Sequence, residues 1–248
     1  MSTAPRRRFA PAYLRRRSAD NRLDEIQLVS KTEATSFVSG GHIDRAEYRA
    51  ECYLCRRPRA FCYCSLIEAF DSATRFVILT QPREAKHRFG TGRMAHLGLR
   101  NSLLVEGVDF SADERIDREL HSPKGFPVLL FPGKDSVNLS RYSPEERMAL
   151  VPAGRRLVVF VLDGTWKSVR KMLRLSQNVA SLPRICFEPP SPSTYRIRRQ
   201  PKAHCYSTIE SIHHVLDMFA PHGLARPVHD NLLTVFRSVI DRQLTHTR

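Results

Sequence analysis

Four short apolar runs constrain the fold of this chain more than any other feature of its sequence. They are rich in Val, Ile, Leu and Phe, they show no alternation of apolar and polar residues, and they cover residues 75–80, 126–131, 156–162 and 184–187. Continuous apolar runs of this length are typical of parallel strands that are covered on both faces. The sequence therefore predicts the buried strands of a mostly parallel sheet.

The segments around these runs carry the signatures of helices. Ser143 precedes a proline and, two residues further on, Glu146, which together are typical of a helix start. Ser207 and Glu210 form a second capping box, and a further amphipathic helix is expected from about Pro227. Strands that alternate with helices predict an α/β fold with helices on both faces of the sheet.

The charge balance narrows the classes of function. Lys and Arg together number 40 and Asp and Glu 25, which gives a formal net charge of +15. An excess of this size favours a polyanionic partner, with nucleic acid as the leading candidate. No run of 18 apolar residues is present, so a membrane span is excluded. The basic start lacks the apolar stretch of a signal peptide, so we expect a cytoplasmic protein.

The first basic cluster lies at the start of the chain. Residues 1–17 contain six arginines and no acidic residue, and the sequence stays polar and without sustained periodicity up to about Gly41. This composition predicts a disordered basic arm over residues 1–45. Two interpretations of the arm stay open: it attaches to nucleic-acid phosphates, or it is a solubilising tail.

A second basic cluster follows Trp166, and its spacing places four charges on one face of a helix. These charges are Lys167, Arg170, Lys171 and Arg174. The opposite face, predicted to be buried, consists of Trp166, Val169, Met172 and Leu173. A run of charges is usually only a solvated face, but four like charges without an acid repel one another, which favours an anion-binding face. A third cluster lies in a Pro-rich loop and contains Arg196, Arg198, Arg199 and Lys202, of which we assign Arg198 and Arg199 to nucleic-acid binding.

Four cysteines fall within 13 residues in the pattern C-x2-C-x6-C-x-C: Cys52, Cys55, Cys62 and Cys64. Four thiolates this close suit a tetrahedral, structural zinc ion, so residues 46–70 are predicted to form a small zinc-binding segment. An iron–sulfur cluster and four unrelated reduced thiols are the alternatives. Cys186 and Cys205 are isolated, and core packing is expected for each.

The longest apolar run leads directly into Asp163-Gly164-Thr165-Trp166 and then into the basic helix. Ligands bind at the carboxyl ends of strands in a parallel α/β sheet, so Asp163 is a candidate proton acceptor at a pocket. Thr165 is placed to cap the helix that follows. The alternative makes Asp163 a helix cap and Trp166 a core residue.

These motifs, in this order, resemble the DTW-domain family of tRNA-uridine aminocarboxypropyltransferases, which is distantly related to the SPOUT methyltransferases. The D-x-T-W signature resembles residues 163–166, and the four cysteines resemble the family's zinc site. Thr91-Gly92-Arg93, Tyr195-Arg196-Ile197-Arg198 and Ser207-Thr208-Ile209-Glu210 resemble three further family segments. The family's H-P-x-E segment reads Gln81-Pro82-Arg83-Glu84 here, so its histidine is absent or moved.

The resemblance implies a SPOUT-like, Rossmannoid catalytic domain over residues 71–248, and a reaction. S-adenosylmethionine would give its 3-amino-3-carboxypropyl group to N3 of a tRNA uridine and leave as 5′-methylthioadenosine. The implied catalytic residues are Asp163, Thr165 and Trp166, and the implied cofactor-binding residues are Glu84, Arg93, Arg196 and Glu210. The expected partner is tRNA, and no protein partner is implied. Two alternatives remain: a SPOUT-type RNA methyltransferase and a noncatalytic zinc-ribbon RNA-binding protein.

Overall fold

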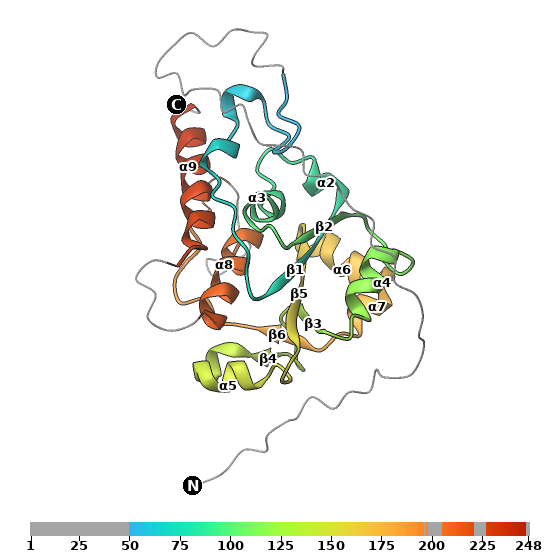
Figure 1. Ribbon diagram of the computed structural model, residues 1–248. Coiled ribbons are helices and arrows are strands. Elements are labelled where there is room, and N and C mark those ends of the chain that lie inside the picture. The colour runs from blue at the N-terminus through green and yellow to red at the C-terminus, as the bar shows by residue number, and fades with distance from the viewer. Residues whose placement is uncertain (1–49, 196, 198–204, 221–226, 247–248) are drawn as a thin grey trace. The chain divides into compact units, whose positions relative to one another are not determined.

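The computed structural model describes residues 50–195, 197, 205–220 and 227–246 (Figure 1). Within these residues the chain forms a six-stranded sheet in the order β2-β1-β5-β3-β6-β4, and every strand pair in it is parallel. The strands are β1 (Arg75–Thr80), β2 (Leu103–Glu106), β3 (Gly125–Leu130), β4 (Val137–Asn138), β5 (Arg156–Asp163) and β6 (Arg184–Cys186). The predicted arm of residues 1–45 and the predicted basic loop at Arg198 and Arg199 lie outside the described residues.

All four predicted strands are present, and each boundary lies within one residue of the prediction. β2 and β4 were not predicted from the sequence. Both lie at the edges of the sheet, and β4 has only two residues, so neither needs the long apolar run that marks a strand covered on both faces.

Helices alternate with the strands, as predicted. They are α2 (Pro82–Ala85), α3 (Thr91–Gly98), α4 (Glu114–Leu120), α5 (Pro144–Ala149), α6 (Trp166–Leu175), α7 (Gln177–Ala180), α8 (Thr208–Phe219) and α9 (Asp230–His246). Short 3₁₀ turns lie at Arg59–Phe61, Cys64–Leu66 and Leu139–Arg141. Both predicted capping boxes are present, at the starts of α5 and α8. No helix within the described ranges is long and apolar enough to cross a membrane.

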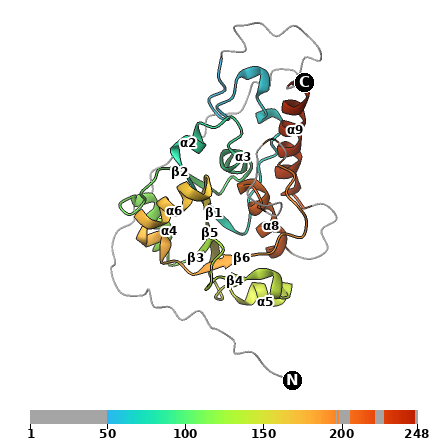
Figure 2. The ribbon, with the colours of Figure 1, turned by 180° about the vertical axis from the view of Figure 1, so that it is seen from behind.

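The helices cover both faces of the sheet, which confirms the predicted α/β layer fold (Figures 1 and 2). On one face Phe76 and Ile78 of β1 share a buried core with α3, α8 and α9. On the other face Val77 and Leu79 of the same strand pack with α4, α6 and α7. Full burial of such a side chain stabilises the fold by about 1.5–3 kcal/mol, so the central strands are strongly held.

The four-cysteine segment packs against the same core as α3, α8 and α9, through Cys55, Tyr63 and Phe70. Asn231 in the first turn of α9 also holds it. The Asn231 side-chain amide donates to the Leu66 carbonyl at 3.1 Å and accepts from the Glu68 backbone N–H at 2.9 Å. The segment is therefore attached to the α/β layers, and the boundary predicted at residue 70 stays a prediction.

Candidate active site

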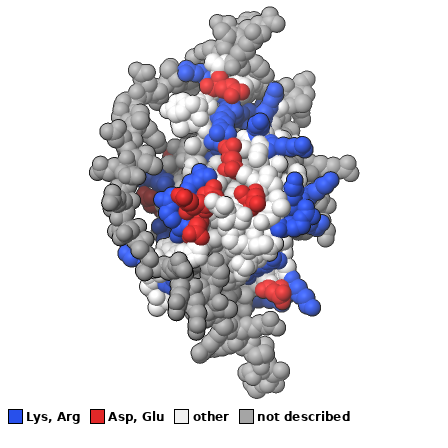
Figure 3. All heavy atoms as spheres, turned by 90° about the vertical axis from the view of Figure 1, so that its right-hand side faces the viewer, with Lys and Arg blue, Asp and Glu red and all other residues white. Residues whose placement is uncertain are grey.

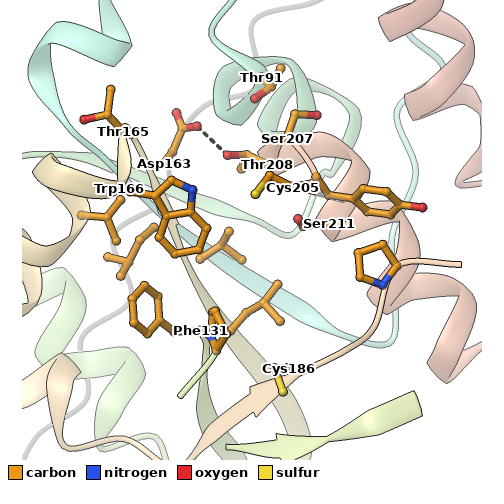
Figure 4. A pocket seen from close by; sticks show the side chains of 18 of the residues that line it. Thr91, Phe131, Asp163, Thr165, Trp166, Cys186, Cys205, Ser207, Thr208 and Ser211 are labelled. Atoms are coloured by element: carbon orange, nitrogen blue, oxygen red, sulfur yellow. Dashed lines mark hydrogen bonds between the residues drawn. The ribbon is translucent and has the colours of Figure 1, made fainter. Parts of the chain in front are cut away.

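Asp163 is the last residue of β5, at the carboxyl end of the sheet, where parallel strands present ligand-binding residues. Its carboxylate is 2% exposed and accepts a hydrogen bond from the Thr208 hydroxyl at 2.6 Å, drawn as a dashed line in Figure 4. Thr208 is the first residue of α8, so a residue 45 positions along the chain fixes the orientation of this carboxylate. Asp163 does not cap α6, because the side chain that caps α6 belongs to Thr165.

Gly92 explains how α3 approaches this carboxylate. A Cβ atom at position 92 would lie 2.5 Å from Oδ2 of Asp163, which is closer than real carbon atoms come to such an oxygen. The glycine therefore lets the first turn of α3 contact Asp163, and the positive end of the helix dipole favours the ionised carboxylate. The Thr-Gly-Arg motif and the Asp163 motif thus meet in one site.

A pocket of about 640 Å³ opens beside Asp163 (Figure 4). Its lining comes from the carboxyl ends of β3, β5 and β6 and from the starts of α3, α6 and α8, and includes Thr91, Phe131, Asp163, Trp166, Tyr195, Tyr206, Thr208 and Ser211. The volume lies within the range of about 300–1,000 Å³ that is typical of pockets for small molecules. The sheet end therefore carries a cavity that could hold a nucleoside-sized ligand.

Trp166 corrects one prediction. Helical spacing predicted this residue on the buried face of its helix, but Trp166 is 40% exposed and lines the pocket. The ring lies 5.9 Å from the ring of Phe131, centroid to centroid, at 54°. As the first residue of α6, Trp166 lies beyond the layer that Val169 and Met172 bury against the sheet. The pocket thus has an aromatic wall.

Thr165 caps α6 as predicted. Its hydroxyl oxygen accepts a hydrogen bond from the Ser168 N–H at 3.2 Å, and the residue also lines the pocket. The N-terminus of this ten-residue helix therefore lies at the pocket, and the start of a helix can attract a carboxylate or a phosphate.

The predicted cofactor-binding residues are not gathered around the pocket. Glu84 is buried in α2, and Arg93 donates a hydrogen bond to Glu106 of β2 at 2.6 Å. Glu210 accepts from the Ser207 N–H at 2.8 Å and from the Thr194 N–H at 2.8 Å, so it joins the loop before α8 to the helix start. None of the three is among the residues that line the cavity. Arg196 lies outside the described residues.

Several pocket residues were not found by sequence reasoning. Phe131 and Tyr206 have no motif of their own, and only the folded sheet brings them beside Trp166 and Asp163. Cys186 and Cys205 were expected to be core residues, but both are only partly buried and both line the pocket. An isolated cysteine gives no spacing signal, so sequence analysis had no means to place these two.

The basic face predicted on α6 is present. Lys167, Arg170, Lys171 and Arg174 are exposed, and Val169, Met172 and Leu173 are buried. Within the described part of the chain no ion pair joins these four side chains to an acid. Figure 3 shows separate groups of basic side chains with acids between them on one side of the molecule. The basic face of α6 therefore has four basic residues and no acidic residue. Lys167, at one end of this face, also lines the pocket.

The four cysteines converge as their spacing predicts. The sulfurs of Cys52 and Cys64 lie 3.8 Å apart and those of Cys55 and Cys62 3.7 Å apart, and all four lie within 4.8 Å of one another. A tetrahedral ion with zinc–sulfur bonds of about 2.3 Å needs sulfurs about 3.8 Å apart, so the set fits. The turn between the first two thiols closes at Arg56, whose φ of 56° is left-handed.

The pKa values of the thiols in this cluster are shifted in opposite directions. The Cys64 thiol and neighbouring backbone N–H groups outweigh burial and lower the pKa of Cys55 to about 5, whereas burial raises the pKa of Cys62 to about 11. A divalent cation would favour the thiolate form of every ligand. The cluster is therefore able to hold a metal ion.

The model of the DTW domain family matches residues 49–244, which include both the cysteine cluster and the pocket. The chain belongs to the DTW domain family. The resemblance drawn from the motifs is thereby confirmed. Gln81, which stands where the resemblance led us to expect a histidine, caps α2: its side-chain oxygen accepts from the Arg83 and Glu84 N–H groups.

Three curated relatives are similar over most of their length. The chain is 30% identical over 200 residues to tRNA-uridine aminocarboxypropyltransferase 2 of Drosophila melanogaster, and the match covers 75% of each chain. It is 24% identical to tRNA-uridine aminocarboxypropyltransferase A of Arabidopsis thaliana, covering 79% of this chain and 82% of the relative. It is 23% identical to tRNA-uridine aminocarboxypropyltransferase 2 of Mus musculus, covering 82% and 67%. No solved structure matches the chain, so its likeness to SPOUT folds stays a prediction.

Proposed function

We propose that this chain transfers the 3-amino-3-carboxypropyl group of S-adenosylmethionine to N3 of a tRNA uridine. Three relatives carry the name of this activity, and the pocket beside Asp163 is the single structural observation that carries the proposal. A bond forms between uridine N3 and the γ-carbon of the transferred group, and the bond from that carbon to sulfur breaks. The sulfur keeps the electron pair, and the other product is 5′-methylthioadenosine.

Asp163 is the proposed general base. The N3–H of uridine is a poor nucleophile until it loses its proton, and a fixed carboxylate within reach can accept that proton. The carboxylate also accepts a hydrogen bond at Oδ1 from the Thr208 hydroxyl. Thr208 thereby acts as a positioning residue, because its hydroxyl orients the carboxylate without contacting the reacting atoms.

The aromatic wall and the α6 terminus give the two substrates their places. Trp166, with Phe131 behind it, offers a ring on which a uracil turned out of the tRNA can stack. S-adenosylmethionine supplies a sulfonium-activated aminocarboxypropyl group, whose carboxylate suits the N–H groups at the start of α6. Because Arg93 is paired with Glu106, we favour this helix terminus over Arg93 as the carboxylate site.

The basic face of α6 is the proposed tRNA-binding surface, and its phosphate contacts would hold the tRNA with its uridine at the pocket. We also propose that the four cysteines hold a structural zinc ion, because a closed set of thiolates leaves no coordination position for a substrate. Four reduced thiols favour a reducing compartment, which agrees with a cytoplasmic location.

The test combines tRNA, S-adenosylmethionine and purified protein, followed by mass analysis of the nucleosides and of the adenosine by-product. We expect aminocarboxypropyl-uridine together with 5′-methylthioadenosine. S-adenosylhomocysteine would instead identify a methyltransferase, and unchanged tRNA would identify a binding protein without this activity.

Asp163→Asn tests the proposed base. The substitution keeps the size of the side chain, so we expect a folded protein that binds tRNA but whose turnover is about 10²–10⁴-fold lower. Asp113→Asn is the matched control, because Asp113 caps α4 far along the chain from the pocket motifs. Near-normal turnover of Asp163→Asn would show that the base lies elsewhere.

A further inference from the structure

A second cluster of metal-binding side chains lies between α8 and α9, and neither the family's motifs nor the proposed reaction uses it. Its members are His213, Asp217, His229 and Asp230, whose ligand atoms all lie within 4.8 Å of one another. His213 and Asp217 are four residues apart on α8 and so share one helical face. His229 immediately precedes α9, and Asp230 is the first residue of that helix.

The contacts within the cluster are short and shared. His213 contacts Asp230 through Nε2 at 2.9 Å and Asp217 through Nδ1 at 3.3 Å. His229 Nε2 lies 2.6 Å from the remaining oxygen of Asp217, and the two imidazole rings are 5.0 Å apart, centroid to centroid. The Asp217 carboxylate therefore contacts both imidazoles, and the His213 imidazole contacts both carboxylates.

Burial separates this cluster from an ordinary surface pair. His213 and His229 are only 8% and 7% exposed, whereas the two carboxylate side chains are 41% and 53% exposed. Burial opposes a positive charge on His213, but its hydrogen bonds with Asp217 and Asp230 outweigh burial and raise its pKa. The cluster thus concentrates negative charge around two imidazoles and leaves one side open to solvent.

A pair with the same spacing elsewhere shows what the helix alone produces. His121 and Asp117 on α4 are also four residues apart and 2.9 Å from each other. Both of their side chains are more than half exposed, and neither belongs to a metal-binding group among the described residues. Helical spacing therefore explains one histidine–aspartate pair, but not the arrival of a second pair from α9.

We propose that this cluster is a second zinc site, with His213 Nε2, His229 Nε2, one oxygen of Asp217 and one oxygen of Asp230 as its four ligands. Imidazole nitrogen and carboxylate oxygen both bind zinc at about 2.0–2.2 Å, which sets neighbouring ligand atoms about 3.3 Å apart. Two of the contacts, at 2.6 and 2.9 Å, are shorter than that value, and all four ligand atoms lie within 4.8 Å of one another, so the set is already close to the size of a zinc site.

Charge and orientation also fit. Two neutral imidazoles and two carboxylates carry a charge of −2, which balances a divalent ion. The second oxygen of Asp217 keeps its contact with Nδ1–H of His213, and such a hydrogen bond orients a metal-bound imidazole. All four ligands come from the protein, so the ion has a structural role.

The ion would join α8 and α9, which contact Asp163 and the cysteine segment, respectively. α8 begins with Thr208, which holds Asp163, and α9 continues with Asn231, which holds the segment after the four cysteines. A zinc ion bridging α8 and α9 would therefore fix a helix pair that contacts Asp163 through α8 and the cysteine segment through α9. The proposal does not depend on the reaction, because it concerns metal content alone.

The experiment counts zinc in the full chain. Protein is loaded with Zn²⁺, dialysed against buffer containing excess Mg²⁺, and analysed for metal by mass spectrometry. We expect two zinc ions per chain for the parent protein and for His121→Ala, the matched control. We expect one for His213→Ala/His229→Ala, because its four cysteines are untouched.

A milder variant guards against a loss of folding in the double variant. Asp230→Asn changes the most exposed ligand and should weaken Zn²⁺ binding at this site at least about 10-fold, with an unchanged far-ultraviolet circular dichroism spectrum. A parent protein that binds no more zinc than the His213→Ala/His229→Ala variant overturns the proposal. An Asp230→Asn variant that is folded and binds two zinc ions as tightly as the parent also overturns it.

Discussion

The two clusters of potential metal ligands differ in how their side chains are brought together. The four cysteines lie within 13 consecutive residues. The left-handed conformation of Arg56 and two 3₁₀ turns fold this short segment so that the four sulfurs converge. The histidine–aspartate cluster draws two residues from α8 and two from the start of α9, and it forms only when those helices pack. The cysteine cluster therefore depends on residues that are close in sequence, whereas the histidine–aspartate cluster depends on the tertiary fold.

This difference predicts different consequences for folding. A metal that binds a local cluster can order its segment before the sheet forms, and its binding free energy is then part of the folding free energy. A metal between two packed helices instead binds a nearly formed site and stabilises the native state by mass action. Substitutions in the two clusters should therefore lower the stability of the protein by different amounts.

The largest effect is expected for Cys62→Ser. Losing one thiolate should release the zinc ion of the cysteine segment and lower the thermal midpoint by several degrees or more, because Tyr63 and Phe70 of that segment belong to the main core. Metal analysis and thermal unfolding measure both changes. Cys186→Ser, which removes a thiol outside the cluster, should keep all its zinc. Unchanged zinc content in Cys62→Ser would show that the cluster is not a metal site.

The next effect concerns tRNA binding, which neither cluster should influence directly. Replacing Arg170, Lys171 and Arg174 with Glu leaves the pocket residue Lys167 intact and reverses the outer part of the basic face. We expect weaker tRNA binding and a slope of log K against log salt that is shallower by about 2–3, with zinc content unchanged. Arg118→Glu on the exposed side of α4 is the control. An affinity and slope equal to those of the parent protein would identify the α6 face as merely solvated.

A smaller effect is expected at the end of α8 that is nearest the pocket. Thr208→Val removes the hydroxyl that donates to Asp163, and a hydrogen bond to a charged group contributes about 1.5–3 kcal/mol. Turnover should fall about 10- to 100-fold, and Thr208→Ser should restore most of it. Thr245→Val, which loses only hydrogen bonds to carbonyls within α9, should have normal turnover. If the valine variant keeps full activity, Thr208 does not position the base.

The smallest effect is expected where α9 meets the cysteine segment. Asn231→Ala removes two hydrogen bonds, to Leu66 and from Glu68, and should lower the free energy of unfolding by about 1–3 kcal/mol. Amide hydrogen exchange should increase most in the cysteine segment, with an unchanged metal content. A uniform increase over the whole sheet would argue that Asn231 does not act locally.

The same contrast between local and distant information explains what could be predicted. Residues 156–163 form one continuous apolar strand that ends at Asp163, so the strand and its terminal carboxylate were visible in the sequence. The four cysteines were visible for the same reason. The pairing of Arg93 with Glu106 was not, because Glu106 belongs to β2, an edge strand with four residues and only a weak apolar signal.

Helical periodicity gave a wrong prediction for Trp166, at the start of α6. Trp166 shares its helical spacing with Val169 and Leu173, but periodicity describes a helix as if neighbours covered its whole length. The first turn of α6 projects beyond the sheet, so Trp166 reaches the pocket instead of the core. Phe131, Cys186 and Cys205 join it from other elements, and no local pattern marks their approach.

The contact between Gly92 and Asp163 sets a limit for anyone who wishes to redesign this pocket. Even a single methyl group at position 92 would displace the carboxylate, so a library that varies position 92 also varies the placement of residue 163. The two positions should be treated as one unit and held fixed together. Changes to substrate preference are better sought at other residues that line the pocket, such as Phe131 or Tyr206.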